Sequence, residues 1–191
     1  MEIIKFDLEE LKKAETGFAY YLLGRSYDLE ENGAEQNYEK ALQYYQKGLE
    51  LNHPLCMYMI GISYELGLGD VLPIDKEKAK ELLVKAKPEI IKLMNDQTVS
   101  KEERLYAKFT MGAYYYFGLG DVEKDESLAF MIIEECAKEG HLAAIYDLGA
   151  NFYYNGVGTK QNLELANYYL KIAQESKLPR AIKLYQKRNQ K

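Results

Sequence analysis

Residues 140–166, GHLAAIYDLGANFYYNGVGTKQNLELA, contain the pattern that decides the fold of this 191-residue chain. Its centre is Gly149, which follows an apolar residue and precedes an aromatic residue by three positions. The same arrangement recurs earlier, so that four such glycines lie at residues 24, 61, 112 and 149, separated by 37, 51 and 37 residues. A local pattern that returns at such intervals is typical of a repeat architecture, in which one supersecondary unit is copied along the chain.

A second set of positions repeats in step with these glycines. In each copy an Asn or Asp stands four residues before an alanine: Asn37, Asp75, Asp125 and Asn162. Such a side chain accepts a hydrogen bond from an unpaired amide in the first turn of a helix, so each position predicts a helix start. Glycine pairs at 67 and 69, 118 and 120, and 156 and 158 predict the preceding turns. The chain is therefore predicted to be all-α, with a helix A around each repeated glycine and a helix B after each Asn or Asp.

The repeated glycines lie inside helix A, where each costs about 1 kcal/mol relative to alanine. We expect close approach of a second helix backbone to offset that cost. Small residues in register support this expectation, five residues before each glycine and near the end of each helix B: Ala19, Cys56, Ala107, Ala144, Gly48, Ala86, Cys136 and Ala173. The two cysteines are therefore predicted to be reduced, buried packing residues, with a disulfide or a nucleophile as the less favoured alternative. His53 and His141 share one turn position, which favours a role in the repeat over metal binding or base catalysis.

The spacing sets the expected boundaries of a single solenoid domain over residues 1–191. Repeats 1 and 2 are expected at about 17–52 and 53–87, repeats 3 and 4 at about 101–140 and 141–177, and a C-terminal cap at 178–191. Residues 2–14 are expected to form an N-terminal capping helix.

Two departures from the regular spacing predict local changes. The long interval contains an insert at about 88–100, in which Pro88 predicts a break in helix B and Ser100 to Glu103 predict a capping box. This insert is either a longer helical hairpin or a projection for a specific partner. In repeat 4, seven residues separate Gly149 from Gly156 where repeats 2 and 3 have six, and a bulged helix or a shifted turn would accommodate the extra residue.

Charge and hydropathy argue against several classes of function. The chain has 25 Lys and Arg against 30 Asp and Glu, a net charge of −5 with both signs mixed, which argues against nucleic acid or an anionic membrane surface as the main partner. No apolar run approaches the roughly 20 residues that span a bilayer, so membrane insertion is not expected. The first residues lack the pattern of a secretory signal. Sparse cysteine favours a cytoplasmic protein, although a secreted or periplasmic form stays open if a signal has been removed.

The stretch from Gly140 to Ala166 resembles the SEL-one-like repeat family, which is related to the tetratricopeptide repeats. Its alanines, its Leu-Gly pair, its Gly-Val-Gly turn and the spacing of Asn162 and Ala166 follow the family pattern, and the resemblance covers about residues 17–177. It implies a right-handed α/α superhelical solenoid of about four helix-turn-helix repeats with capping helices, in which helix A lines the concave side. It also implies an adaptor or scaffold for protein complexes.

We predict a non-enzymatic protein–protein interaction module that binds a protein or peptide partner on its concave surface. Candidate partner-binding residues are variable positions of helix A: Leu22, Arg25, Asp28, Met59, Glu65, Thr110, Tyr114, Asp147, Asn151 and Tyr154. No catalytic, cofactor-binding or metal-binding residue is predicted, and the oligomeric state stays open. One alternative is a dedicated bacterial immunity or regulatory protein that sequesters one partner. A less favoured one is a β-lactamase-like hydrolase, because the cysteine pairs of such members of the family are absent from this sequence.

Overall fold

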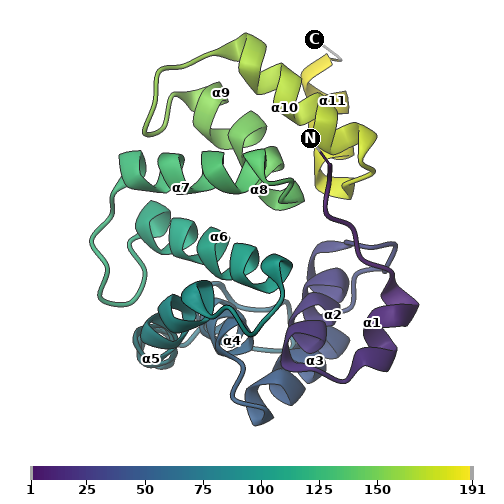
Figure 1. Ribbon diagram of the computed structural model, residues 1–191, viewed down its shortest axis with the longest axis vertical. Helices are drawn as coiled ribbons and strands as arrows, with labels where there is room; N and C mark the ends of the chain where they lie inside the picture. Colours follow the sequence, from purple (N-terminus) through teal and green to yellow (C-terminus); the bar gives the residue numbers. More distant parts are fainter. Residues whose placement is uncertain (1, 190–191) are drawn as a thin grey trace. The chain divides into compact units, whose positions relative to one another are not determined.

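The computed structural model describes residues 2–189, and helices account for most of them (Figure 1). In chain order the helices are α1 (Leu8–Ala14), α2 (Gly17–Leu29), α3 (Tyr38–Glu50), α4 (Pro54–Leu66), α5 (Lys76–Asn95), α6 (Lys101–Phe117), α7 (Glu126–Lys138), α8 (Leu142–Asp147), the π-helix η1 (Leu148–Phe152), α9 (Tyr153–Asn155), α10 (Leu163–Glu175) and α11 (Pro179–Asn189). Residues 2–189 contain no β-strand, and Leu68 and Leu72 form one isolated antiparallel bridge. The prediction of an all-α fold is confirmed.

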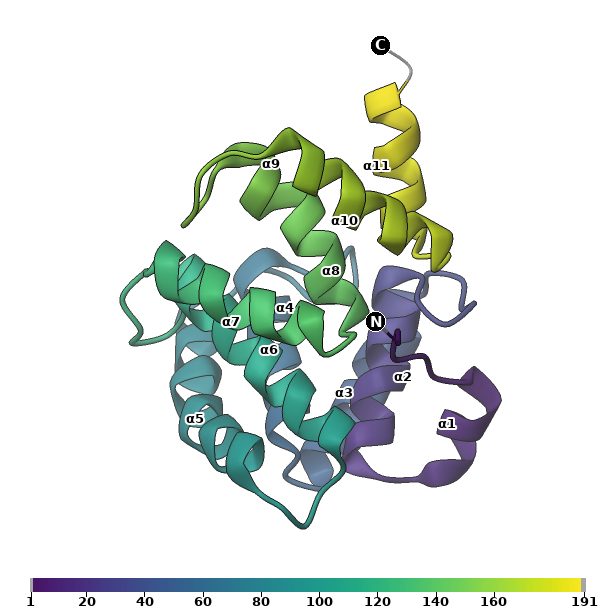
Figure 2. The same cartoon turned by 45° about the horizontal axis from the view of Figure 1, so that its top comes forward.

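Contacts divide the chain into two compact units. Of the described residues, the N-terminal unit contains 5–103 and 119–121, and the C-terminal unit contains 2–4, 104–118 and 122–189. Within the first unit α2 packs on α3 and α4 packs on α5; within the second, α10 packs on η1, α8 and α11 (Figure 2). Helix A and the following helix B of these repeats therefore form a packed pair. The single domain expected from the sequence stays a prediction.

The same joint connects helix A to helix B in all four repeats. The backbone N–H of the Asn or Asp cap donates to a tyrosine carbonyl near the end of helix A at 2.8 to 2.9 Å; the pairs are Asn37 with Tyr27, Asp75 with Tyr64, Asp125 with Tyr115, and Asn162 with Tyr153. Each cap side chain then accepts from the amide three residues later at 2.9 to 3.0 Å. These bonds satisfy backbone groups that a helix end leaves unpaired. The predicted starts of the B helices are confirmed.

The repeated glycines are required by two kinds of contact. At the first three, a Cβ atom would overlap a large helix B side chain four residues after the repeated alanine: Tyr45, Leu83 or Ile133. At Gly149, a Cβ atom would lie 2.6 Å from the backbone nitrogen of Leu170 and 2.8 Å from the carbonyl oxygen of Ala166. The expected approach of two backbones is therefore confirmed at Gly149, whereas the other three glycines make room for a side chain.

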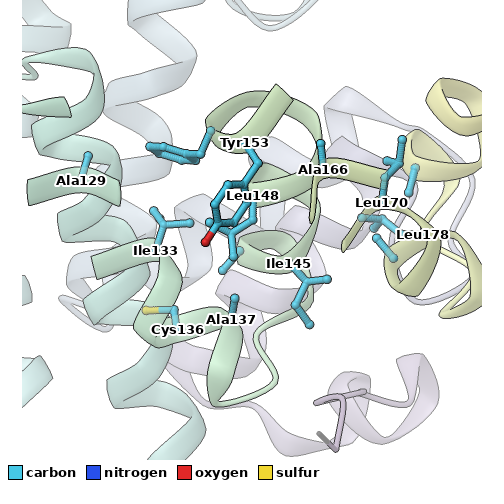
Figure 3. Packing of buried hydrophobic residues seen from close by; sticks show 14 of the residues in the cluster. Ala129, Ile133, Cys136, Ala137, Ile145, Leu148, Tyr153, Ala166, Leu170 and Leu178 are labelled. Carbon is cyan, nitrogen blue, oxygen red and sulfur yellow. The ribbon is translucent and has the colours of Figure 1, made fainter. Parts of the chain in front are cut away.

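Both cysteines are free and fully buried, as predicted. Burial raises the pKa of the Cys56 thiol, and it raises the pKa of the Cys136 thiol to about 12. Figure 3 shows Cys136 beside Ala137 and Ile133 in the core of the C-terminal unit. The two cysteines, which lie at positions where the other repeats have Ala or Gly, are therefore packing residues, because neither described cysteine forms a disulfide.

Helix α5 continues through Pro88, so the predicted break in helix B is wrong. A proline inside a helix removes the hydrogen bond to the carbonyl four residues earlier, here that of Val84, at a cost of about 3 kcal/mol. Ala86 and Ile90 on either side of Pro88 are fully buried, so the apolar face of the helix continues past the proline and offsets that cost. The first part of the insert, residues 88–95, is the end of α5.

At the start of α6 the serine half of the predicted capping box is present, whereas the Glu103 side chain bonds elsewhere than to the Ser100 amide. Ser100 Oγ accepts a hydrogen bond from the Glu103 amide at 3.1 Å. The Glu103 carboxylate contacts the side chain of His53, with 3.0 Å between Oε1 and Nε2. The second part of the insert is therefore a capped turn into helix A of repeat 3.

The extra residue of repeat 4 is accommodated in the π-helix η1, as the sequence spacing predicted. The Tyr153 N–H donates to the Leu148 carbonyl, five residues earlier. Counting from Gly149 in the regular frame would bring Phe152 to the joint with helix B, but the π turn brings Tyr153 there instead. The insertion is thus absorbed inside helix A, and the joint is unchanged.

The N-terminal helix is shorter than predicted. Helix α1 begins at Leu8, because Asp7 Oδ1 accepts from the amides of Glu9 and Glu10 at 2.9 Å and caps the helix there. Residues 2–6 lie outside any helix. The Ile4 N–H donates to the Gly140 carbonyl at 3.1 Å within the C-terminal unit, so the apolar residues before Asp7 pack as a non-helical segment.

Candidate interaction site

Five of the ten predicted partner-binding residues are buried. They are Leu22, Arg25, Met59, Thr110 and Tyr114. Arg25 is only 6% exposed, and its guanidinium donates to Glu31 Oε1 at 2.8 Å in the turn after α2. These side chains pack inside the structure and are not presented to solvent.

Two further candidates join helix A to its surroundings in the N-terminal unit. Asp28 is half-buried, and its carboxylate accepts from the Tyr45 hydroxyl at 3.2 Å. Burial raises the pKa of Asp28, and the hydrogen bond from Tyr45 partly opposes that increase. Glu65 Oε1 lies 2.6 Å from Lys76 Nζ at the start of α5. Both carboxylates therefore already have a partner within the chain.

Asp147 and Asn151 are brought together in the C-terminal unit, where both line a cavity of about 60 Å³. The larger side chains that complete its lining come from α6, α7 and η1: Phe109, Tyr116, Phe117, Ile133 and Phe152. Tyr154 lies outside this lining and is 37% exposed, with the Arg188 guanidinium carbon 3.5 Å from the centre of its ring. The structure therefore assembles two of the ten predicted residues into one site, among aromatic side chains.

The π turn is what places Asn151 at this cavity. In repeat 2 the residue two positions after the glycine is Ser63, which is buried and donates to the Met59 carbonyl at 2.8 Å. Asn151 has the same offset from Gly149, but it lies inside η1 and is half-buried at the cavity. π turns inside α-helices occur frequently at functional sites.

The carbonyls of the π turn are bound by the last described helix. Arg188 donates to the carbonyl oxygens of Gly149 and Ala150 at 3.0 Å each. A π turn leaves carbonyls outside the regular helical hydrogen-bond pattern, and buried carbonyls of this kind need a donor. Arg188 therefore holds the widened turn in place, a role that its position in a polar, basic terminus did not predict.

The aromatic lining of the cavity was not predicted from the sequence. Phe117 is the last residue of α6 and is 64% exposed. Leu66 has the same place at the end of α4 and is 69% exposed. The signal that could have found them is a large apolar residue directly before the first glycine of the turn, where the helix ends and the side chain has little to pack against.

The site offers an apolar recess with polar groups at its edge. Such a recess can take an apolar side chain, while an amide such as that of Asn151 can both donate and accept a hydrogen bond.

Within residues 2–189, no group of three or more His, Cys, Asp or Glu side chains could hold a metal ion. No helix in the described part of the chain is both long and apolar enough to cross a membrane.

The two histidines occupy equivalent structural positions. Each is the residue before a helix A, His53 before α4 and His141 before α8, and both are buried. His141 Nδ1 accepts from the Ala144 amide at 3.2 Å and so caps its helix. Their common place in the repeat, predicted from the sequence, is confirmed.

Comparisons with known proteins agree with the repeat pattern. The Sel1 repeat model matches residues 17–53, 54–87, 105–141 and 142–177. No curated protein matches the chain. Among solved structures, the chain is similar to a Sel1 repeat protein from Oxalobacter formigenes, with 26% identity over 85% of this chain and 57% of that one and a TM-score of 0.43.

Two other similar structures come from Escherichia coli and Pseudomonas aeruginosa. One is a protective antigen of uropathogenic Escherichia coli strains with an SLR fold, at 21% identity over 90% of this chain and 34% of that one, with a TM-score of 0.43. The other is an immunity protein from Pseudomonas aeruginosa, at 15% identity over 90% of this chain and 70% of that one, with a TM-score of 0.36. This chain thus spans 57% of the length of the Oxalobacter protein and 34% of the E. coli antigen.

Sel1 repeats are generally protein-interaction modules and are generally not catalytic. The family that the sequence resembles is confirmed by the four matched segments, which together cover more than half of the residues. The repeated glycines, the capped B helices and these four segments lead to the same conclusion: the chain belongs to the Sel1 repeat family.

Proposed function

We propose that this chain is a non-enzymatic interaction module that holds a protein or peptide partner on the surface formed by its A helices, expected on the concave side. The cavity of the C-terminal unit would anchor one apolar side chain of that partner. The observation that carries the proposal is this aromatic recess, with Phe117 exposed at its edge and Asn151 in its lining. Apolar anchors that enter a recess supply most of the binding energy of many protein interfaces.

The state of the cysteines supports a binding role over a hydrolase. The thiolate is the reactive form of cysteine, and burial raises the pKa of both Cys56 and Cys136. Neither thiol is therefore suited to act as a nucleophile at neutral pH. Two free cysteines also fit a cytoplasmic location, which is part of the proposal. A dedicated immunity or regulatory protein that sequesters one partner is a narrower form of the same function and would use the same surface.

The test is capture of the natural partner followed by a comparison of two matched variants. Tagged protein is used to capture proteins from the source cells, the captured protein is identified and purified, and its affinity is measured by calorimetry. Phe117→Ser should weaken binding about tenfold or more, since hot-spot anchor residues commonly contribute about 2 kcal/mol or more. Leu66→Ser is the control, because Leu66 is similarly exposed, 69% against 64% for Phe117, at the end of the equivalent helix.

Equal affinities of wild type and Phe117→Ser would contradict the cavity as the anchor. A loss of binding only in Leu66→Ser would move the interface to the N-terminal unit. Turnover of a small substrate by the purified protein, abolished by one point substitution, would contradict the non-enzymatic proposal.

A further inference from the structure

Three tyrosines of repeat 1 form a stacked ladder in the N-terminal unit. The ring of Tyr44 on α3 stacks on that of Tyr27 at a centroid distance of 5.8 Å and an angle of 7°. The Tyr44 ring also stacks on that of Tyr20, which lies seven residues before Tyr27 on α2, at a centroid distance of 6.2 Å and an angle of 26°. All three side chains are half-buried, so their rings are packed but reach the surface.

Lysine side chains cover this ladder. Lys47 Nζ lies 5.8 Å from the centre of the Tyr20 ring and 5.5 Å from that of Tyr44. Lys40 Nζ lies 5.2 Å from the centre of the Tyr27 ring. Neither ammonium forms an ion pair with a carboxylate of residues 2–189, in contrast to Lys12 on α1, which pairs with Glu9 at 2.6 Å.

Lys12 also belongs to this region. The hydrogen bond to Glu9 raises the pKa of Lys12, and the nearby Tyr27 and Tyr44 add to that increase. We give the name tyrosine–lysine patch to Tyr20, Tyr27, Tyr44, Lys40 and Lys47; Lys12 lies beside it and is paired with Glu9. The ammonium groups of Lys40 and Lys47 give the patch a positive charge on a chain whose net charge is −5.

Repeat 4 contains the same tyrosine stack, and there a carboxylate of the chain itself bonds to it. Tyr153 and Tyr169 occupy the positions of Tyr27 and Tyr44, and their rings stack at 5.7 Å and 3°. There the Tyr153 hydroxyl donates to the carboxylate of Glu134 on α7, the preceding helix B, at 3.1 Å. Within the C-terminal unit, the stack is therefore completed by an acidic side chain from a neighbouring helix.

Repeat 1 has no preceding helix B, and α1 stands before it in the chain. Among the described residues, no carboxylate accepts from the hydroxyls of Tyr20, Tyr27 or Tyr44. Phenol hydroxyls and ammonium groups are both donors, and a carboxylate is the acceptor that satisfies both with charge-assisted hydrogen bonds. The ring faces are already occupied by other rings or by ammonium groups, which leaves little room for a nucleotide base to stack.

We infer that the tyrosine–lysine patch of repeat 1 binds an acidic segment of a protein partner, whose Asp or Glu carboxylates take the place that Glu134 has in repeat 4. This surface lies in the N-terminal unit and does not depend on the cavity of the C-terminal unit. Because the attraction acts between exposed charges, it should weaken as salt screens them.

The test uses a fluorescent oligoglutamate peptide as the probe and fluorescence anisotropy as the measurement. Wild type is compared with Lys40→Gln/Lys47→Gln and with Lys78→Gln/Lys85→Gln. Lys78 and Lys85 have the same positions in repeat 2, where Leu82 replaces the second tyrosine of the stack, so this control removes the same charge without touching the ladder.

Oligoglutamate should bind wild type at low ionic strength, and its affinity should fall about tenfold or more in Lys40→Gln/Lys47→Gln through the loss of charge-assisted hydrogen bonds. The repeat 2 control should retain affinity within about twofold.

Equal losses of oligoglutamate affinity in the two variants would show that only net charge matters and would overturn the inference, as would the absence of any binding. Tighter binding of a single-stranded oligonucleotide than of oligoglutamate would assign the patch to nucleic acid instead. A cavity variant such as Phe117→Ser should leave oligoglutamate binding unchanged, which separates this surface from the proposed anchor.

Discussion

Repeats 2 and 4 build helix A on the same glycine but use the following residues differently. In repeat 2 the helix is regular, Ser63 is buried, and the chain reaches the joint between Tyr64 and Asp75 after three residues. In repeat 4 one more residue precedes the equivalent joint at Tyr153, and η1 absorbs it. The hydrogen bond at both joints is 2.9 Å long.

The difference shows how a single inserted residue can change a repeat without changing its packing frame. The π turn keeps the joint and the cap of the next helix, while it moves Asn151 from a packing position to the lining of a cavity. Arg188 supplies the donors that the turn requires. Repeat 4 thus gains a residue that lines a cavity, while its π turn needs hydrogen-bond donors from another helix.

Deletions in the two helices should produce the largest contrast. Removing Ile62 from α4 moves Tyr64 out of the joint with Asp75, and we expect this to lower the free energy of unfolding by about 4 kcal/mol or more. Removing Ala150 restores the regular spacing between Gly149 and Tyr153, so it should cost less than about 1 kcal/mol. Urea denaturation followed by circular dichroism measures both. If the two deletions lowered the free energy of unfolding by similar amounts, η1 would not be the place where an extra residue is accommodated.

Alanine at the repeated glycines should give the next largest contrast. Gly149→Ala places a Cβ atom against the backbone of α10 and should lower the free energy of unfolding by about 2 to 3 kcal/mol. Gly61→Ala meets Leu83, whose Cγ would lie 2.9 Å away but whose side chain can turn. The gain in helix propensity of about 1 kcal/mol should offset most of that contact. Melting temperatures that fall equally in the two variants would contradict the backbone approach at Gly149.

The role of Arg188 should depend on the π turn. Arg188→Met removes two hydrogen bonds to carbonyls and the contact with Tyr154, and should lower the free energy of unfolding by about 1 to 2 kcal/mol. In the variant that lacks Ala150, the same substitution should cost less than about 0.5 kcal/mol, because the carbonyls regain helical partners. A double-mutant cycle measures this coupling, and additive losses would show that Arg188 acts independently of η1.

The cysteine of the C-terminal unit should have the smallest effect, visible in the pH dependence of stability. Burial raises the pKa of Cys136 to about 12 in the folded chain, against about 8.5 in an unfolded one. The unfolded state therefore loses this proton first, so the contribution to stability is complete below pH about 8.5 and decreases as the pH rises toward 12. Cys136→Ala should make the alkaline decrease in the urea midpoint shallower, with a loss of about 1 kcal/mol at neutral pH. Rapid thiol labelling of the native protein would contradict this burial.

The parts of the fold that were predictable are those set by short-range chemistry. The Asn and Asp caps and the paired glycines define the helix boundaries, and the seven-residue spacing after Gly149 is itself the signal of η1. The predicted helix break at Pro88 was wrong, because the burial of Ala86 and Ile90 outweighs the lost hydrogen bond. That burial is not visible in the local sequence pattern. The non-helical segment at 2–6 was missed for a similar reason, since its contacts are with residues far along the chain, such as Gly140.

The site was less predictable than the fold. Offsets from the repeated glycine select positions on helix A, but they do not say which positions a neighbouring helix covers, and so Arg25 and Tyr114 are buried. Asp147 and Asn151 reach a cavity because α6 supplies aromatic side chains opposite them. That opposition is a tertiary property, and no local spacing encodes it.

We propose that the π turn of repeat 4 shapes the surface that binds the partner. The measurement that tests it most directly is calorimetric titration of the captured partner into wild type and into the variant that lacks Ala150. We predict that the deletion variant keeps its helical circular dichroism and melts within about 4 °C of wild type. Its affinity for the partner should fall about tenfold or more, because the residue that lines the cavity is withdrawn into a regular helix. A deletion variant that binds the partner as tightly as wild type would contradict the account.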